Sequence, residues 1–417
     1  MVRALLPAGL AAVLSACGEA QEATPPVVAT DSAGVRIVAN FRSMWEGAPT
    51  QRGWRISEAP TRVMGLELLQ VSGVAPLPSG KVSVASGGLN ELWVFGRGDS
   101  VGEVVGGPGD GPGEFRRLGG VFPCGEGTLV ADDFDRIHVF APDGGHLRTE
   151  ELRRLVGDGV RRVLGVSADC SDVLLRTGPF VAPAPGRTTR MPISLAWSTP
   201  PGVRDTLVVD ANGWQVTSLN GRDAPFVVWG RDTYAGTNGR VTVVAGSDFP
   251  EYKVFQDRRL SMIVRWSPEP QRVEAADRDH YSALRDRLVD EFPPLSEFLL
   301  ELGEYPDIPE TKPVFAGVLV DDENRVWLRR YPAFVAGRPD VFDYTGSSFA
   351  HVLRQALSEQ ENWTVFEADG RWLGSVSLPP NFSLKVVRNG EAIGVQYEAL
   401  GVERVVAYQV SQGPPGR

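Results

Sequence analysis

Histidine and cysteine are scarce in this sequence, with 4 and 3 residues in a chain of 417. The histidines show no metal-ligand spacing such as H-E-x-x-H, and no G-x-S-x-G motif presents a nucleophilic serine. No serine or cysteine has a histidine placed to suggest a catalytic triad. The sequence therefore gives no positive evidence for catalysis or for a metal centre. The four histidines are His138, His146, His280 and His351.

An excess of positive charge is also missing, because the net charge is −10. A nucleic-acid partner would require a basic face, so we expect none. With 42% hydrophobic residues, the composition is that of a globular protein rather than a membrane or disordered one. Past the N-terminus, no stretch is apolar over the roughly 20 residues that span a bilayer.

The first residues predict a lipoprotein signal peptide over residues 1–16. A short positive start precedes the apolar run Ala4–Leu14, which is too short to span a bilayer. Leu14–Cys17 resembles a lipobox, where the peptidase cuts before a cysteine whose thiol accepts a diacylglyceryl group. We expect Cys17 to carry the lipid and residues 17–30 to form a flexible tether. The alternative is an ordinary signal peptide with an incidental cysteine.

The expected anchor also sets the compartment. Gly18, rather than Asp, follows Cys17, which by the sorting pattern of familiar lipoproteins favours the outer membrane over the inner one. We therefore expect a cell-envelope protein that is lipid-anchored to the outer membrane and faces the periplasm. That compartment permits disulfides, and the sequence leaves open whether Cys124 and Cys170 form one.

The chain holds 47 Gly and 32 Pro, which separate many short apolar runs. Short strands between such turns predict an all-β fold. The runs at 92–95, 137–140 and 363–366 are L-W-V-F, I-H-V-F and W-T-V-F, and each precedes a turn and another strand-like run. The first two are spaced like propeller blades, which repeat every 40–50 residues or so. We expect residues 31–417 to form a six-bladed β-propeller of four-stranded antiparallel blades.

The expected blades cover most of this domain, at 71–106, 116–152, 160–210, 222–275, 313–378 and 382–411. Val35–Ala39 precedes them as a spare strand, which we expect to pair with the last blade and close the ring. Apolar residues at helical spacing predict a helical insert at about 275–303, near the fifth blade, and a shorter helix at Ala350–Leu357.

Two segments resemble the repeats of NHL-type six-bladed β-propellers. Gly107–Phe115, GPGDGPGEF, is similar to their inter-blade turn, and Val130–Phe140, VADDFDRIHVF, is similar to their D-x-x-N-x-R-I-x-V-F strand pair, with Asp135 near the usual Asn position. Together with DSAGVRIV at the start, WLRRYP and WTVFEADGRWLG, they make the chain resemble the family of bacterial six-bladed β-propeller lipoproteins. The resemblance implies the fold and no particular activity.

Two basic groups are candidates for ligand binding at the channel mouth of such a ring. Arg329, Arg330 and Tyr331, with Arg116 and Arg117, could bind an acidic or carbohydrate ligand there. The alternative is that they are solvated strand ends and turns. Gly107–Phe115 could hold an anion through backbone N–H groups, but it lacks the context of a phosphate loop. We expect it to be a tight turn with Phe115 packed between blades.

Two carboxylate clusters could hold Ca²⁺ through oxygen ligands. Neither matches EF-hand spacing, and Asp and Asn favour turns through their own backbone hydrogen bonds. We therefore expect no cofactor and keep Ca²⁺ as an alternative. The clusters are Asp132, Asp133 and Asp135, and Asp321, Asp322, Glu323 and Asn324.

The function that fits these observations best is a membrane-tethered, non-catalytic binding or scaffolding propeller. Its partners would be the membrane, through the lipid, and an envelope protein or carbohydrate ligand. The alternative is a metal-dependent hydrolase or lyase with its site in the central channel. A third hypothesis is an assembly factor for outer-membrane proteins.

Overall fold

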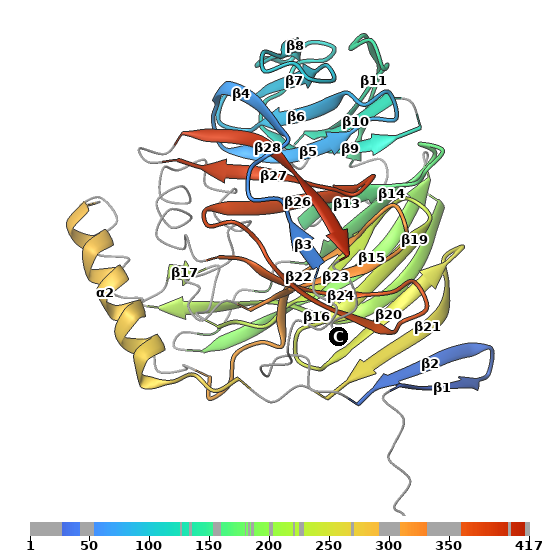
Figure 1. Ribbon diagram of the computed structural model, residues 1–417, viewed down its shortest axis with the longest axis vertical. Coiled ribbons are helices and arrows are strands. Elements are labelled where there is room, and N and C mark those ends of the chain that lie inside the picture. Colours follow the sequence, from blue (N-terminus) through green and yellow to red (C-terminus); the bar gives the residue numbers. More distant parts are fainter. Residues whose placement is uncertain are drawn as a thin grey trace, which may run out of the picture.

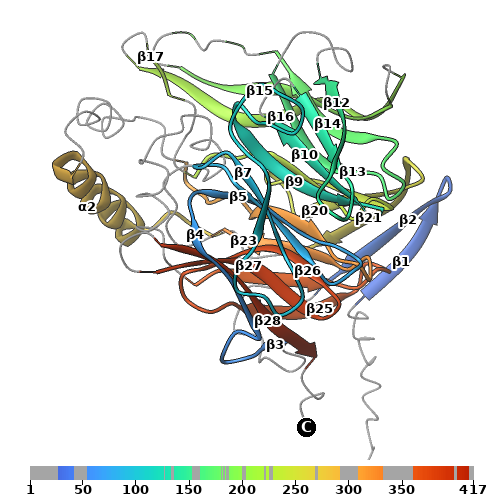
Figure 2. The same ribbon diagram turned by 90° about the horizontal axis from the view of Figure 1, so that it is seen from above.

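The computed structural model describes residues 27–41, 54–125, 127–132, 136–152, 160–179, 181, 184, 187–199, 203–219, 222–224, 229–267, 271–291, 309–331, 360–398 and 402–412. Its strands form six mostly antiparallel sheets, arranged around a common axis as a β-propeller (Figures 1 and 2). Cys17 and the expected signal peptide lie outside the described residues.

The first two sheets match the segments 71–106 and 116–152 that the repeat predicted. The first contains β5 (Val71–Pro76), β6 (Val82–Ser86), β7 (Glu91–Phe95) and β8 (Glu103–Gly106). The second contains β9 (Leu118–Cys124), β10 (Gly127–Asp132), β11 (Arg136–Phe140) and β12 (His146–Glu151).

The other sheets are less uniform than the expected four-stranded units. The third contains β13 (Val160–Val166), β14 (Val173–Gly178), β15 (Thr188–Thr199), β16 (Val203–Leu219) and β17 (Arg222–Ala224). The fourth is built on β18 (Thr233–Thr237), β19 (Val241–Gly246), β20 (Glu251–Gln256) and β21 (Arg259–Trp266). The fifth contains β22 (Phe315–Val320), β23 (Val326–Arg330), β24 (Asn362–Phe366) and β25 (Trp372–Ser377). The sixth contains β26 (Phe382–Arg388), β27 (Glu391–Tyr397) and β28 (Glu403–Gln412).

Two early strands complete the sixth sheet. β4 (Arg62–Leu68) pairs antiparallel with β28, and β3 (Trp54–Ile56) pairs with the end of the same strand. β4 contributes Met64, which is fully buried in the core between the sixth and first sheets. The sheet that ends the chain is therefore held by strands from near its start, as a closed ring requires.

The prediction that Val35–Ala39 closes the ring is wrong. β2 (Val35–Asn40) runs parallel to β21 on the outside of the fourth sheet, and β1 (Val27–Ser32) lies outside β2 (Figure 2). The position of β2 follows from burial, because its residue Val38 is 1% exposed and belongs to the core that contains Val264. Since β1 begins at Val27, the last residues of the expected tether 17–30 are strand instead.

One strand of each sheet lies innermost, next to the axis of the ring. Each of these strands contacts the innermost strand of the sheet on either side, and the last contacts the first. In order around the axis they are β5, β9, β13, β18, β22 and β26.

Apolar side chains pack the sheets face to face. Middle strands such as β6 and β19 bury nearly every residue, because both faces meet a neighbouring sheet. Between the fourth and fifth sheets, the rings of Tyr252 and Trp266 lie 5.2 and 5.4 Å from that of Phe366. A lone sheet would expose these faces, so burial favours the ring.

Gly107–Phe115 is a tight turn between the first and second sheets, as expected. The Phe115 N–H donates to the Gly107 carbonyl oxygen (2.9 Å). Gly113 has a φ of 78°, a conformation that L side chains rarely adopt. Phe115 itself is buried against Leu92 of the first sheet and Phe140 of the second.

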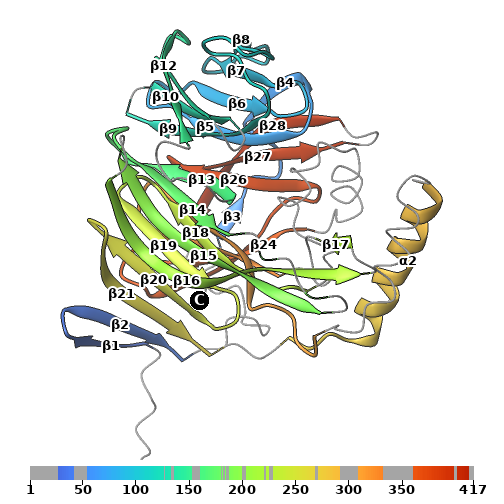
Figure 3. The ribbon, with the colours of Figure 1, turned by 180° about the vertical axis from the view of Figure 1, so that it is seen from behind.

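Helix α2 (Ala275–Glu291) lies within the expected helical insert, at the end of the molecule where β15 and β16 project (Figures 1 and 3). The Asp277 carboxylate accepts the Glu274 N–H (2.9 Å) and pairs with the Lys312 ammonium (2.7 Å), which fixes the start of the helix to the segment before β22. Residues 292–308 and the candidate helix Ala350–Leu357 lie outside the described residues. No helix among the described residues is long and apolar enough to cross a membrane.

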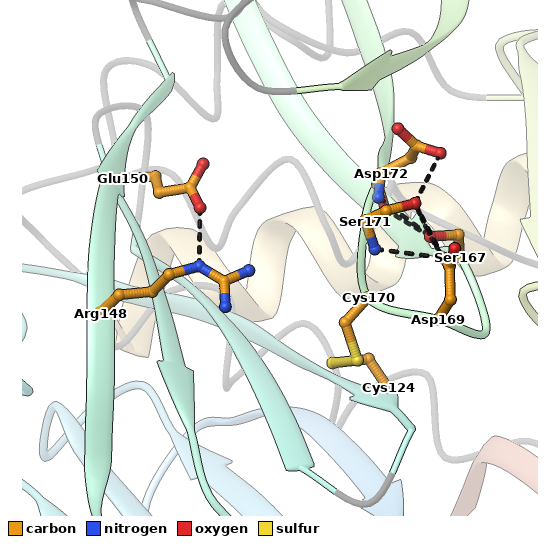
Figure 4. Close-up of a disulfide and its surroundings, with 8 residues drawn as sticks. All are labelled: Cys124, Arg148, Glu150, Ser167, Asp169, Cys170, Ser171 and Asp172. Atoms are coloured by element: carbon orange, nitrogen blue, oxygen red, sulfur yellow. Dashed lines mark hydrogen bonds and ion pairs between the residues drawn. A yellow bond between two sulfur atoms is a disulfide. The ribbon is translucent and has the colours of Figure 1, made fainter.

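Cys124 and Cys170 form a disulfide (Figure 4). Cys124 ends β9 and Cys170 lies in the turn between β13 and β14, so the bond joins the second and third sheets. The Asp169 carboxylate shapes this turn by accepting the Ser167 hydroxyl (2.6 Å) and the Ser171 N–H (3.1 Å). These hydrogen bonds lower the pKa of Asp169 to about 2.

Candidate functional site

A cavity of about 730 Å³ lies between the six innermost strands, and we call it the central channel. Each innermost strand contributes to its wall, together with short flanking segments. The wall residues come mainly from the segments 70–78, 117–125, 162–168, 235–240, 318–322 and 385–388.

The central channel has two ends, which we name the turn mouth and the insert mouth from the segments around them. The turn mouth is formed by the turns that follow the innermost strands, and its wall includes Gly125, Ala168 and Asn238. The insert mouth lies where the innermost strands begin, and its wall includes Gln70 and Arg117. The connection from β21 to β22, which carries α2, is on the insert side (Figure 3).

Neighbouring turns bind one another around the turn mouth. The Gly125 N–H donates to the Ala168 carbonyl oxygen (3.1 Å), beside the disulfide, and the Ala168 N–H donates to the Gly239 carbonyl oxygen (3.2 Å). In the next turn, the Asn238 side-chain amide donates to the Asp321 carbonyl oxygen (2.8 Å). Three consecutive junctions between sheets are thereby linked.

Two further junctions are linked by charged residues. The Asn389 N–H donates to the Asp322 carboxylate (2.9 Å), which connects the fifth and sixth sheets. The Arg388 guanidinium donates to the Pro76 carbonyl oxygen (3.0 Å), which connects the sixth sheet to the first. These bonds fix the shape of the turn mouth before any ligand arrives, and such preorganisation lowers the cost of binding.

The innermost strands carry β-bulges that change which residues face the axis. Register shifts interrupt the pairing of five innermost strands, β5, β9, β13, β22 and β26, with the next strand of each sheet. A bulge adds one residue and re-aims side chains locally. Four of the five extra residues line the central channel: Ser72, Gly119, Leu164 and Lys385.

Positive charge dominates the described wall of the central channel. Five cationic side chains line it, against one carboxylate, Asp322. This balance is opposite in sign to the whole chain, whose net charge is −10. The cations are Arg117 and Arg162 toward the insert mouth, and Arg240, Lys385 and Arg388 toward the turn mouth.

Of the candidate pair Arg116 and Arg117, Arg117 lines the central channel and Arg116 does not. Arg116 lies on the surface of the loop before β9, with its Nε 2.5 Å from the Asp110 carboxylate. This ion pair lowers the pKa of Asp110.

The candidate group Arg329, Arg330 and Tyr331 lies at the end of β23, away from the described wall of the central channel. Arg329 pairs with the Glu361 carboxylate (3.3 Å) and donates to the Ala316 carbonyl oxygen (3.0 Å). Burial lowers the pKa of Arg330. Burial raises the pKa of the Tyr331 phenol, which is therefore neutral over the physiological range.

The Asp321 cluster is organised by hydrogen bonds within its own turn. Asp321 Oδ2 accepts the Arg325 Nε–H (2.6 Å) and the Trp327 indole N–H (2.9 Å), and Oδ1 accepts the Glu323 and Arg325 backbone N–H groups. Asp133 and Asp135 lie outside the described residues. Within the described ranges, no three His, Cys, Asp or Glu side chains are grouped to hold a metal ion.

Sequence reasoning missed four of the five channel cations, namely Arg162, Arg240, Lys385 and Arg388. Arg388 comes directly before the Asn389-Gly390 hairpin turn, and Arg240 directly after the turn that follows β18. A search for charged residues at the ends of innermost strands and in the turns that follow them would have found both. Lys385 is aimed at the axis by a bulge, which leaves no mark in the sequence.

No protein-family model and no curated protein matches this chain. The solved structures that are similar to this chain include the following three. A Bacteroides fragilis protein described as exported shares 10% identity over 91% of this chain and 100% of its own, with a TM-score of 0.46. A member of the DUF4221 family from Bacteroides vulgatus shares 10% identity over 87% and 100%, with a TM-score of 0.49. A Xanthomonas campestris gluconolactonase shares 10% identity over 93% and 98%, with a TM-score of 0.43. At these values no activity carries over to this chain.

Proposed function

We propose that this chain is a lipid-anchored, six-bladed β-propeller of the cell envelope that binds a ligand in its central channel without chemical conversion. Each of the six sheets would be one blade. The closed series of innermost strands supports this count. The NHL-like turn at Gly107–Phe115, with its buried Phe115, supports the family resemblance.

The central channel is the observation that carries the proposal. Its volume of about 730 Å³ lies within the range of roughly 300–1,000 Å³ that is usual for small-molecule sites. Its wall combines apolar residues such as Val74 and Val166 with polar groups such as Ser72 and Asn238. The linked turns give this site a fixed shape at the turn mouth.

The tether would orient the ring relative to the outer membrane. β2 is parallel to β21 and β1 is antiparallel to β2, so β1 begins on the insert side. Val27 follows Cys17 by ten residues, which extend to about 35 Å at most. A lipid on Cys17 would therefore hold the insert mouth near the membrane and leave the turn mouth facing the periplasm.

The alternative, a metal-dependent hydrolase or lyase, needs several ligands around one point of the channel. Asp322 is the one carboxylate in the described wall, and its oxygen already accepts the Asn389 N–H. No observation on the described residues favours this alternative over binding.

The test is recovery of the natural ligand from protein purified out of the envelope. Small molecules released by denaturation are identified by mass spectrometry from the wild type, Ala168→Trp and Ala59→Trp. Ala168 is exposed at the turn mouth, where an indole would obstruct entry, and Ala59 is exposed away from the channel wall. We expect a stoichiometric molecule from the wild type and Ala59→Trp and much less from Ala168→Trp. No molecule, or equal recovery from both variants, would contradict channel binding.

A further inference from the structure

The charge of the central channel narrows the chemistry of its ligand, if the proposed function is right. Five cations and one carboxylate line the described wall. Field lines concentrate in a cavity with low-dielectric walls, so a net positive wall raises the local concentration of anions.

The cations are divided between the two ends of the channel. Arg117 precedes β9 and Arg162 lies early in β13, on the insert side. Arg240 and Arg388 lie at the turn mouth. Lys385 lies three residues before Arg388 on β26, deeper in the channel. Three of the five cations are therefore gathered toward the turn mouth, and two lie toward the insert mouth.

The turn-mouth cations are positioned by the fold. The bulge at Leu384/Val386 turns Lys385 to the axis, and the bond to the Pro76 carbonyl oxygen fixes the guanidinium of Arg388. Arg240 is exposed and follows Asn238, whose side-chain amide is bound to the next turn. Charged groups on such supported backbone lose little conformational freedom when they bind an anion.

The size of the cavity and the charge of the whole chain separate small anions from polymers. A nucleic acid or acidic polysaccharide would have to approach an outer surface that belongs to a chain of net charge −10. A small anion can enter a cavity of about 730 Å³. We propose that the central channel binds a small organic anion with two or more carboxylate or phosphate groups, held at the turn mouth by Arg240, Lys385 and Arg388.

The test is isothermal titration calorimetry on the full mature chain, with citrate, inorganic pyrophosphate and neutral trehalose as probes. Citrate and pyrophosphate distinguish carboxylate from phosphate recognition. The channel variant is Arg240→Gln/Lys385→Gln/Arg388→Gln. The control, Arg148→Gln/Arg265→Gln/Arg371→Gln, removes three exposed arginines outside the channel wall and changes the net charge equally. If the channel variant does not fold, Arg240→Glu alone replaces it, because Arg240 is exposed.

We expect at least one anion to bind the wild type and the control, with trehalose inert. The channel variant should bind at least about tenfold more weakly, since three partly screened charge interactions are lost. Raising the salt concentration should weaken binding to the wild type. Equal anion affinity for the channel variant and the wild type, or no binding of either anion, would overturn the inference. Binding of trehalose alone would also overturn it, and would leave the channel as a ligand site.

Discussion

Gly73 on β5 lies so close to Val121 on β9 that a Cβ at residue 73 would be 2.7 Å from the Val121 backbone nitrogen. The two innermost strands approach at this point because residue 73 has no side chain. Backbone atoms cannot move aside as a flexible side chain can. This contact sets how tightly the first and second sheets close around the axis.

Gly73→Ala should therefore destabilise the protein by about 1–3 kcal/mol through overpacking. Gly120→Ala is the matched control on β9, because its Cβ would meet only the Phe122 ring, at an ordinary 3.5 Å. We expect the control to change the free energy of unfolding by less than about 0.5 kcal/mol. Urea denaturation followed by tryptophan fluorescence measures both, and equal stabilities would show that the strands are not in close contact.

The disulfide between Cys124 and Cys170 should stabilise the ring, because it closes a loop over a sequence separation of 46. Cys124→Ser/Cys170→Ser should lower the free energy of unfolding by about 2–4 kcal/mol. The same loss should follow when the wild type is measured in a reductant, which serves as the control. A double variant as stable as the oxidised wild type would mean that the bond contributes nothing.

Tyr252 is buried between the fourth and fifth sheets, and its hydroxyl has no hydrogen-bond partner among the described residues. Burial raises the pKa of its phenol well above the ordinary value. An unsatisfied buried hydroxyl costs free energy, so Tyr252→Phe should leave stability unchanged or raise it by up to about 1 kcal/mol. In contrast, Tyr408→Phe removes a bond to Gln396 Oε1 (3.3 Å) and should cost about 1 kcal/mol. Thermal unfolding of both variants compares them, and a loss for Tyr252→Phe would reveal a missed partner.

Asp169 should make the stability of the protein depend on acidic pH. Its pKa is lowered to about 2 by hydrogen bonds from Ser167 and Ser171, so its stabilising effect is present above the unfolded pKa, about 3.8. The effect is lost as pH falls through the folded pKa. Because the carboxylate is exposed, we expect less than about 1 kcal/mol. Between about pH 5 and pH 2, the free energy of unfolding should fall less steeply with decreasing pH for Asp169→Asn than for the wild type. An identical slope for the two proteins would contradict the assignment.

The sequence predicted the strands where pattern and turn chemistry agreed. The L-W-V-F run before Gly96 became β7, and the Gly-rich segment ending at Phe115 became the turn between two sheets. Both depend on local rules, namely alternation along a strand and the backbone freedom of glycine.

Ring closure and the site could not be predicted in this way, because they depend on contacts between distant residues. β4, Arg62–Leu68, pairs with Glu403–Gln412 more than 300 residues later, and β2 is as apolar a candidate for that place. Lys385 faces the channel only because a bulge shifts the register of β26. Arg116 and Arg117 are adjacent, yet only Arg117 reaches the wall, which composition does not reveal.

The central claim is that a ligand binds at the axis of the ring. Hydrogen–deuterium exchange of the mature chain, measured alone, with citrate and with inorganic pyrophosphate, tests this claim most directly. With at least one of citrate and pyrophosphate, each tested at saturation, we predict slower exchange in the turn at 238–240 and in residues 385–390, with no change in the outer strands β8 and β12. Protection confined to those outer strands, or no protection around the turn mouth with either anion, would contradict the account.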